Sequence, residues 1–250
     1  MKMKIGIMDS GLGGATVLRA CLKELPNHEY LYFADSTNAP YGTKSKEVVA
    51  HLTQCAVDFL IEKGAQLIVL ACNTATSAAV AMLRAQYDIP IIGMEPALKP
   101  GLEVAKNKRV LITATALTLS QQKFKDLHHA LDVHQQGDFL PLTELVTYAE
   151  TGVFDPEIIN TYLKEKLTTF NLEAYGSIVL GCTHFPLFEE NFKALFPKDV
   201  VIVDGTAGTV NRIKTFLTDE SSTPSHTFYL SGQQVETGET YELFKKIIQS

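Results

Sequence analysis

Several features that define common classes of protein are missing from this sequence of 250 residues. No apolar run approaches the roughly 20 residues that a membrane-spanning helix needs, and the N-terminus lacks the apolar core of a signal peptide. Lys and Arg number 22 against 28 Asp and Glu, the formal net charge is -6, and no basic stripe is visible. These absences argue against a membrane protein, a secreted protein and a nucleic-acid-binding protein.

The four cysteines lack the spacing of a zinc site, because no two of them form a C-x-x-C pair. With 46% hydrophobic residues, the chain can bury a core without disulfide bonds. We therefore expect a cytoplasmic protein with free thiols and no metal. Cys21 and Cys55 fall on apolar helix faces, so we expect both of them to be buried core residues.

Short apolar runs alternate with amphipathic helical stretches along the chain. The apolar runs predict strands at 5–8, 30–34, 67–71, 90–93, 109–113, 177–181, 200–203 and 226–230. The amphipathic stretches predict helices at 15–25, 45–63, 74–87, 119–131, 143–150, 156–170, 186–196 and 238–248. Continuous apolar strands between helices are typical of mainly parallel sheets that helices cover on both faces. The predicted fold class is therefore α/β.

Two segments that lie far apart resemble each other. Residues 68–74 read IVLACNT and residues 178–184 read IVLGCTH, so each buried strand ends in a small residue, a cysteine and polar groups. This echo predicts two similar doubly wound domains related by a pseudo-twofold axis. Pro96 and Pro100 interrupt the helix and strand pattern, which places the boundary near them.

The predicted first domain comprises residues 1–97 plus 207–250, and the second comprises residues 98–206. Ligands of open α/β sheets bind beyond the carboxyl ends of the strands. We therefore expect Cys72 and Cys182 to meet at an active site in the cleft between the two domains. Backbone N–H groups and the helix dipole at such a position lower the pKa of a thiol from its usual value of about 8.5.

Two thiols on opposite sides of one cleft suit racemisation. One group removes the proton from the α-carbon, and the other group delivers a proton to the opposite face. A thiol and a thiolate can exchange these roles, so the same pair serves both directions of the reaction. Asn73, Thr74 and Thr183 follow the two cysteines and offer hydrogen bonds to a substrate.

Two candidate helpers accompany the cysteines. Asp9 precedes the glycine-rich turn Ser10-Gly11-Leu12-Gly13-Gly14, which matches neither the dinucleotide fingerprint nor a phosphate-binding Walker loop. Asp9 is a candidate partner of Cys72 or of a substrate ammonium, and the alternative is a helix N-cap. His184 is a candidate proton partner of Cys182, and the alternative is a structural histidine.

Three weaker candidates come from loops and helix ends. The Pro40-Tyr41-Gly42 loop is suited to closing over the cleft, and it also reads as an ordinary turn. Thr115 and Thr118 follow a predicted strand of the second domain, where they can bond a ligand or cap a helix. Glu150 ends a predicted helix, and a solvated helix end is its simpler interpretation.

These motifs together make the sequence similar to the glutamate racemases of the cofactor-independent aspartate and glutamate racemase family. The motifs that carry the resemblance are Asp9-Ser10-Gly11-Leu12-Gly13-Gly14, Pro40-Tyr41-Gly42, Ala71-Cys72-Asn73-Thr74-Ala75, Glu95-Pro96 and Gly181-Cys182-Thr183-His184-Phe185-Pro186-Leu187. The resemblance implies interconversion of L- and D-glutamate without pyridoxal phosphate or metal, and D-glutamate supplied for peptidoglycan. It also implies a small-molecule substrate as partner, and the sequence leaves a homodimer open.

The resemblance also implies roles for single residues. Cys72 would deprotonate the D-enantiomer with help from Asp9, and Cys182 would deprotonate the L-enantiomer with help from His184. The residues implied to bind the substrate are Ser10, Pro40, Tyr41, Gly42, Asn73, Thr74, Thr115, Thr118, Glu150 and Thr183. Asn38 and Phe124 depart from the family pattern, because many members carry a basic residue and a tyrosine there.

Three other functions stay open at this point. An aspartate racemase shares the two-cysteine plan, and His184 favours glutamate because related aspartate enzymes tend to carry an acidic residue there. A cysteine hydrolase that uses Cys182 and His184 predicts that Cys72 is dispensable. A binding protein on the same fold predicts ligand binding without proton exchange at the α-carbon.

Overall fold

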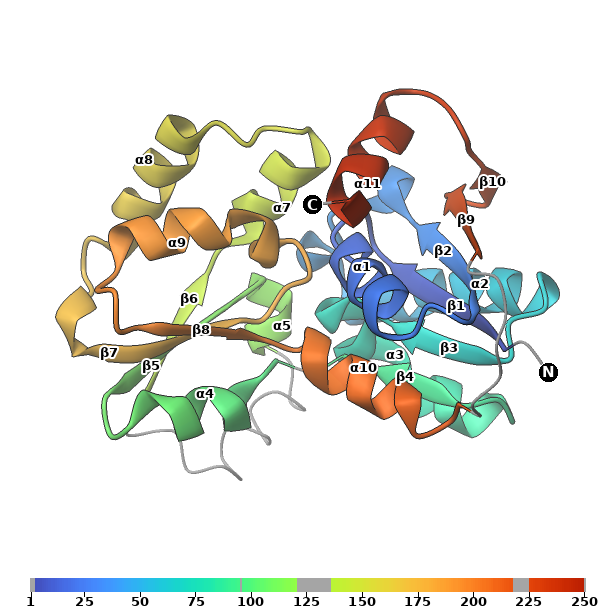
Figure 1. Cartoon of the computed structure of the whole chain (residues 1–250), viewed down its shortest axis with the longest axis horizontal. Coiled ribbons are helices and arrows are strands. Elements are labelled where there is room, and N and C mark those ends of the chain that lie inside the picture. The colour runs from blue at the N-terminus through green and yellow to red at the C-terminus, as the bar shows by residue number, and fades with distance from the viewer. Residues whose placement is uncertain (1–2, 95, 121–135, 218–224, 250) are drawn as a thin grey trace.

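The computed structural model of the chain describes residues 3–94, 96–120, 136–217 and 225–249. Its strands form two separate sheets that lie side by side in the molecule (Figure 1). The first sheet has the strand order β10 (Gln233–Gln234), β9 (Ser225–Leu230), β2 (Glu29–Ala34), β1 (Lys4–Asp9), β3 (Leu67–Leu70) and β4 (Ile91–Gly93). The second has the order β6 (Gly137–Pro141), β5 (Arg109–Ala114), β7 (Tyr175–Leu180) and β8 (Val201–Asp204).

The two sheets share one topology. The order β2-β1-β3-β4 in the first sheet corresponds strand by strand to β6-β5-β7-β8 in the second, and all of these pairs are parallel. The first sheet adds β9, which is parallel to β2, and β10, which is antiparallel to β9. The predicted α/β fold class with mainly parallel sheets is therefore confirmed. The matching strands β3 and β7 are the two that precede Cys72 and Cys182.

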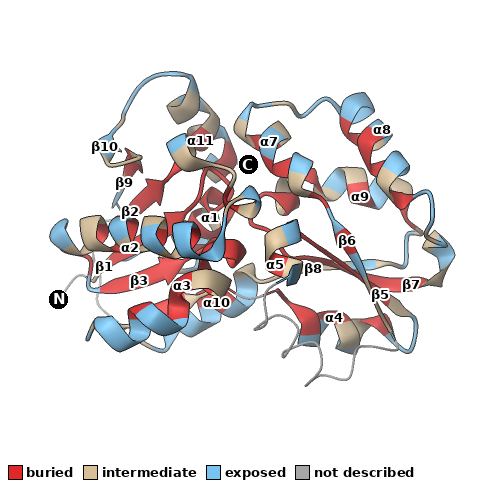
Figure 2. Ribbon diagram, turned by 180° about the vertical axis from the view of Figure 1, so that it is seen from behind, coloured by how far each residue is buried: buried red, intermediate tan, exposed pale blue. Residues whose placement is uncertain are grey.

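Helices cover both faces of each sheet, which explains why the central strands β1, β3, β5 and β7 are buried along most of their length (Figure 2). One face of the first sheet packs against α1 (Ala15–Glu24), α10 (Thr206–Lys214) and α11 (Glu239–Gln249), and the other packs against α2 (Lys46–Glu62) and α3 (Asn73–Gln86). The second sheet packs against α7 (Thr143–Glu150), α8 (Pro156–Leu167) and α9 (Glu189–Leu195) on one face and α4 (Leu98–Ala105) on the other.

Neighbouring residues of one strand enter different cores, as the alternation of a strand requires. Ile7 packs with the helices on one face of the first sheet, and Met8 packs with those on the opposite face. Leu111 and Ile112 of β5 divide in the same way between the two cores of the second sheet. Full burial of each such side chain stabilises the fold by about 1.5–3 kcal/mol. This packing holds the strands in place, and with them the polar residues at their carboxyl ends.

Shorter helical segments complete the described chain. They are η1 (Ser36–Asn38), η2 (Tyr41–Thr43), α5 (Ala116–Ser120), η4 (Leu172–Ala174) and η5 (Phe185–Phe188). The helix predicted at 119–131 overlaps α5 at its start, and its residues from 121 onward lie outside the described residues, as does Phe124. The predicted helix at 186–196 is divided between η5 and α9. None of the helices in the described part of the chain combines the length and the apolar character that a membrane span requires.

The prediction that Cys55 is a buried core residue is wrong. Cys55 is exposed, because α2 turns its stripe of Val49, Ala56, Val57 and Leu60 toward the sheet instead of the stripe that contains Cys55. Pro100, expected to interrupt the pattern near the domain boundary, lies in the first turn of α4, where the missing N–H costs no hydrogen bond. The strands of each sheet fall within the predicted domain bounds 1–97 plus 207–250 and 98–206, and the bounds themselves stay a prediction.

Candidate active site

The two cysteines stand at equivalent points of the two sheets. Cys72 follows β3 and caps α3, where its Sγ accepts a hydrogen bond of 3.4 Å from the N–H of Ala75. Cys182 follows β7 and precedes η5. Only 5% of Cys72 and 8% of Cys182 is exposed. The topology of the fold therefore places one buried thiol at the carboxyl end of each matching strand.

The thiol of Cys72 is surrounded by groups that favour its protonated form. Its Sγ donates to the Oγ of Ser10 over 3.5 Å. Burial raises the pKa of Cys72 to about 12, and the negative charges of Asp9 and Cys182 add to this effect. Hydrogen bonds that Ser10 and the N–H of Ala75 donate to the ionised sulfur oppose it. Cys72 is therefore a thiol at neutral pH in this structure.

Asp9 connects the two halves of the site. One of its carboxylate oxygens accepts the N–H of Gly11 over 2.9 Å, and the other accepts the hydroxyl of Thr183 over 2.9 Å. Asp9 is completely buried, and burial raises its pKa, although the charge of His184 and both hydrogen bonds oppose the shift. Because Thr183 follows Cys182, the carboxyl group beside Cys72 is bonded directly to the segment that carries the other cysteine.

Cys182 faces an imidazole in place of a carboxyl group. Its Sγ lies 3.7 Å from Nδ1 of His184, and Nε2 of His184 lies 2.6 Å from Oε1 of Glu150. Burial lowers the pKa of His184, but the hydrogen bonds and negative charges of Cys182 and Glu150 outweigh it and raise the pKa well above its usual value. The geometry fits an imidazolium that donates to both neighbours.

The carboxylate of Glu150 bridges the two halves a second time. Its Oε1 accepts the N–H of Leu12 over 2.6 Å, and its Oε2 accepts the hydroxyl of Ser36 over 3.1 Å. Burial raises the pKa of Glu150, and the bonds and charge of His184 more than reverse this, so the pKa is lowered overall. The N–H of Gly13 also lies 3.2 Å from Nε2 of His184, but a protonated Nε2 can only donate, and the shorter contact with Glu150 takes precedence.

The glycine-rich turn is packed against both helpers. A Cβ on Gly13 would lie 2.4 Å from Nδ1 of His184, and a Cβ on Gly14 would lie 2.6 Å from the Cβ of Asp9. Real side chains do not approach this closely, so only glycine allows the turn to touch His184 and Asp9 together. The motif that resembled neither a dinucleotide fingerprint nor a Walker loop therefore serves close packing around the two helpers.

Three hydroxyl groups join the halves beside Cys72. The Oγ1 atoms of Thr74, Thr115 and Thr118 lie 3.0 Å from one another in a closed triangle, and all three residues are buried. The neighbouring Asn73 is also buried, and its Oδ1 has no hydrogen-bond partner within the described residues. Buried polar atoms normally have a partner, so this free acceptor indicates a place for a ligand donor.

The structure gathers the predicted residues around the two thiols with few differences. Tyr41 is buried in the same core as Cys72, Gly42 packs against Thr115, and Pro40 begins the short helix that holds both. Glu150, expected at the substrate, contacts His184, and a contact with the substrate stays a prediction. Sequence reasoning overlooked Asp35, which is buried and accepts the hydroxyl of Tyr41 over 2.6 Å. Its position directly after β2, next to Asp9 at the end of β1, is the signal that could have revealed it.

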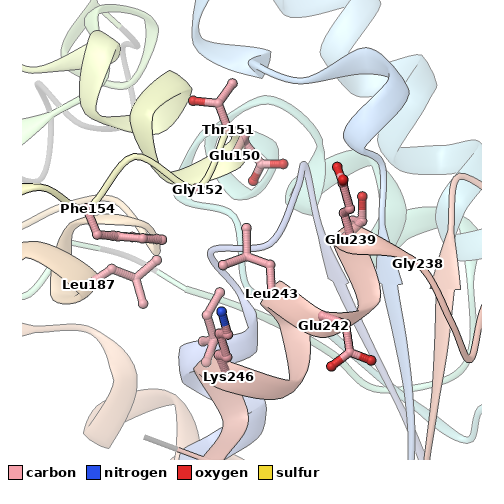
Figure 3. Close-up of a pocket in the computed structure, with 12 residues that line it drawn as sticks. Glu150, Thr151, Gly152, Phe154, Leu187, Gly238, Glu239, Glu242, Leu243 and Lys246 are labelled. Atoms are coloured by element: carbon pink, nitrogen blue, oxygen red, sulfur yellow. The ribbon is translucent and has the colours of Figure 1, made fainter.

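A cavity of about 910 Å³ lies on the other side of Glu150, between the end of α7 and the C-terminal helix α11 (Figure 3). Phe154 and Leu187 form its wall on one side, and Leu243 and Lys246 line it from α11. Of the described residues that line it, none is a cysteine. The cavity therefore borders the candidate site through Glu150 and is separate from the two thiols.

The fold and the site together define a two-part α/β enzyme that brings one thiol from each half into a buried polar site. The chain belongs to the Asp/Glu/hydantoin racemase family, whose model matches residues 5–213. The glutamate racemase of Halothermothrix orenii is 47% identical over 240 residues, which cover 94% of this chain and 95% of that one. Glutamate racemase 2 of Bacillus subtilis is 43% identical over 253 residues, covering 99% and 96%.

Solved structures agree with these relatives. The crystal structure of Escherichia coli glutamate racemase with L-glutamate and the activator UDP-MurNAc-ala matches with a TM-score of 0.85 at 27% identity, covering 100% of this chain and 95% of that one. The aspartate racemase of Picrophilus torridus matches with a TM-score of 0.58 at 15% identity, covering 97% and 99%, and so shares the fold alone. The predicted resemblance to glutamate racemases is confirmed.

Proposed function

We propose that this protein interconverts L- and D-glutamate by a two-base mechanism in which Cys72 and Cys182 act on opposite faces of the α-carbon. The observation that carries the proposal is the placement of two buried thiols in one site, each with a different acid–base neighbour. The choice of glutamate is supported by the relatives named above and by the Escherichia coli structure, which contains L-glutamate.

Each cysteine takes one enantiomer in this proposal. The thiolate of Cys182 removes the α-proton of L-glutamate, and His184 holds the negative charge of that sulfur before the transfer. The thiol of Cys72 then donates its proton to the opposite face of the carbanion, which yields D-glutamate. In the reverse direction Cys72 is the base and Asp9 is its helper, while Cys182 is the acid. A positioned base or acid of this kind contributes roughly 10²–10⁴-fold to the rate.

The polar groups around the thiols provide the substrate contacts. The free Oδ1 of Asn73 can accept a hydrogen bond from the substrate ammonium. The hydroxyls of Ser10, Thr74, Thr115, Thr118 and Thr183 are donors for its two carboxylates, together with the Pro40-Tyr41-Gly42 loop. Because the triangle of Thr74, Thr115 and Thr118 is closed in this structure, substrate exchanges hydrogen bonds with these hydroxyls when it enters.

Glu150 supports catalysis through His184 in this proposal and does not bind the substrate. Its two oxygens already accept hydrogen bonds from Leu12, Ser36 and His184. We further propose that the enzyme uses neither metal nor pyridoxal phosphate, and that it supplies D-glutamate for peptidoglycan in the cytoplasm. The division into domains 1–97 plus 207–250 and 98–206 forms part of the same proposal, with the substrate between them.

The test is to incubate the purified protein, stripped of pyridoxal phosphate, with L-glutamate in deuterated water. Optical rotation and deuterium at the α-carbon are followed together. Loss of rotation with solvent deuterium entering the α-carbon is the expected result. Absence of exchange with glutamate would contradict the choice of substrate. Exchange with aspartate alone would then identify an aspartate racemase, and absence of exchange with both would return the hydrolase and the binding protein to consideration.

A further inference from the structure

The segment from Asp35 to Lys44, here named the 35–44 loop, brings Tyr41 and Gly42 to the site. Tyr41 is buried in the same core cluster as Cys72. A Cβ on Gly42 would lie 2.8 Å from the Cβ of Thr115, so the loop of the first half touches the threonines of the second. The position of this loop therefore determines the shape of the pocket in which a substrate would lie.

The carboxylate of Asp35 organises the loop from within. It accepts the hydroxyl of Tyr41 over 2.6 Å, the amide of Asn38 over 3.0 and 3.1 Å, and the hydroxyl of Ser231 over 3.3 Å. Its backbone N–H donates to the carbonyl of Asp9 over 3.0 Å. Asp35 is buried, and the side chains that bond it within the described residues are neutral donors. A buried carboxylate needs several such donors, so these three side chains hold it in one place.

Ser231 reaches this carboxylate from the far end of the chain. Ser231 and Gly232 form the two-residue turn of the β9–β10 hairpin, with φ of +45° and +91°, as a tight hairpin of this kind requires. The N–H of Ser231 donates to the carbonyl of Ala34 over 2.8 Å, and its Oγ accepts the N–H of Thr37 over 3.2 Å. Among the described residues, the hydroxyl of Ser231 thus bonds only the 35–44 loop.

We infer that Asp35 and Ser231 are positioning residues for the substrate, and that the β9–β10 turn acts as a strap that holds the 35–44 loop against the site. This inference rests on the proposed racemase function. Neither residue contacts the reacting atoms, because Asp35 acts through Tyr41 and Ser231 acts through Asp35. A loosened loop must be ordered again when substrate binds, which weakens binding of the substrate and of the transition state alike.

The substitution Ser231→Ala tests the strap. Alanine is smaller than serine and therefore creates no clash. The site borders a cavity of about 440 Å³ that is also lined by Gly232, Asp35 and Asn38. Loss of one hydrogen bond to a carboxylate should raise the KM for glutamate about fivefold, with kcat unchanged within about twofold. The matched control is Thr215→Ala, because the hydroxyl of Thr215, within the described part of the chain, bonds only Arg212 at the end of α10.

A second variant distinguishes loss of this hydrogen bond from general destabilisation of the fold. Ser231→Asn keeps a hydrogen-bond donor and tolerates the positive φ, so it should retain the KM of the wild-type enzyme. A raised KM in Ser231→Ala together with a normal KM in Ser231→Asn and Thr215→Ala supports the strap. An unchanged KM in Ser231→Ala, or an equal rise in Ser231→Asn, overturns it. Wild-type protein that exchanges no α-proton of glutamate would instead refute the proposed function, so the two failures are distinguishable.

Discussion

The surroundings of Cys72 and Cys182 are alike in topology and opposite in chemistry. Cys72 follows β3, which lies next to β1, and Cys182 follows β7, which lies next to β5 in the same strand order. Cys72 has a carboxyl group and a serine hydroxyl beside it, whereas Cys182 has an imidazole supported by a carboxylate. The repeated topology thus fixes where the thiols lie, while the residues around each strand end determine which acid–base group lies beside each thiol.

The difference is suited to a reaction that needs one acid and one base at the same time. Burial and the charges of Asp9 and Cys182 keep Cys72 protonated, and the raised pKa of His184 provides a positive charge beside Cys182. The two surroundings are also joined, since Asp9 bonds Thr183 and Glu150 bonds Leu12. Asp9 and the carboxylate that holds His184 are thereby each bonded to the opposite half, so the halves must be together for both helpers to be in place.

Replacement of either thiol should have the largest effect on racemisation. Cys72→Ser and Cys182→Ser should each lower racemisation by at least about 10³-fold, because a hydroxyl is a much weaker acid than a thiol and is not ionised to act as a base at neutral pH. The matched control is Cys55→Ser, since Cys55 is exposed on α2. Polarimetry with each enantiomer measures the rates. A Cys72→Ser variant with full activity would contradict the account and favour a hydrolase-like site built on Cys182 alone.

Replacement of the helpers should have the next largest effect, about 10²-fold on kcat/KM for both Asp9→Asn and His184→Asn. Because enantiomers have equal free energy, kcat/KM must fall equally in both directions for each variant. The sides are distinguished by the deuterium isotope effect of α-deuterated substrate. We expect this effect to increase with D-glutamate for Asp9→Asn and with L-glutamate for His184→Asn. The same pattern in both variants would refute the assignment of one helper to each thiol.

Two adjacent glycines, one packed against each helper, allow each helper to be displaced separately. Gly13→Ala places a methyl group against His184, and Gly14→Ala places one against Asp9. Each variant should reduce kcat/KM about 10- to 100-fold in both directions and increase the isotope effect with the enantiomer of its own side. The control is Gly208→Ala in α10, where nothing lies within 4 Å and alanine should stabilise the helix by about 0.5–1 kcal/mol. Isotope effects with each enantiomer and thermal unfolding are the measurements. Equal isotope effects in the two site variants would contradict the prediction.

The smallest expected effect comes from replacement of Glu150, the carboxylate that bonds His184. Glu150→Gln removes a negative charge that raises the pKa of His184, so that pKa should fall. The imidazolium exists below its pKa, so the alkaline limb of the pH–rate profile should move to lower pH, with activity at neutral pH reduced about tenfold. Glu144→Gln on the same helix is the control, because Glu144 bonds Tyr162 and Lys166 away from the site. An unshifted profile would exclude this role of Glu150.

Much of this arrangement was predictable from local sequence patterns. Buried strands read as apolar runs, so β1, β3, β5 and β7 were expected within one or two residues of their observed bounds. The echo around Cys72 and Cys182 was enough to predict that matching strands carry them. Both predictions depend on short-range patterns, namely the apolar run of a strand and the polar residues that follow it.

Features that depend on tertiary packing could not be predicted in the same way. The strand β6 contains exposed and intermediate positions, so it lacks a continuous apolar run. The exposed position of Cys55 depends on which of two apolar stripes of α2 meets the sheet. The bond between Asp35 and Ser231 joins residues 196 positions apart, and no local pattern predicts such a contact.

The most direct test of the central claim uses the two cysteine variants with each enantiomer separately in deuterated water, followed by proton NMR at the α-carbon. Cys182→Ser retains Cys72 and should exchange deuterium into D-glutamate only, with its configuration kept. Cys72→Ser retains Cys182 and should exchange deuterium into L-glutamate only. Exchange of the same enantiomer by both variants, or of both enantiomers equally by either one, would contradict the assignment of one thiol to each face of the substrate.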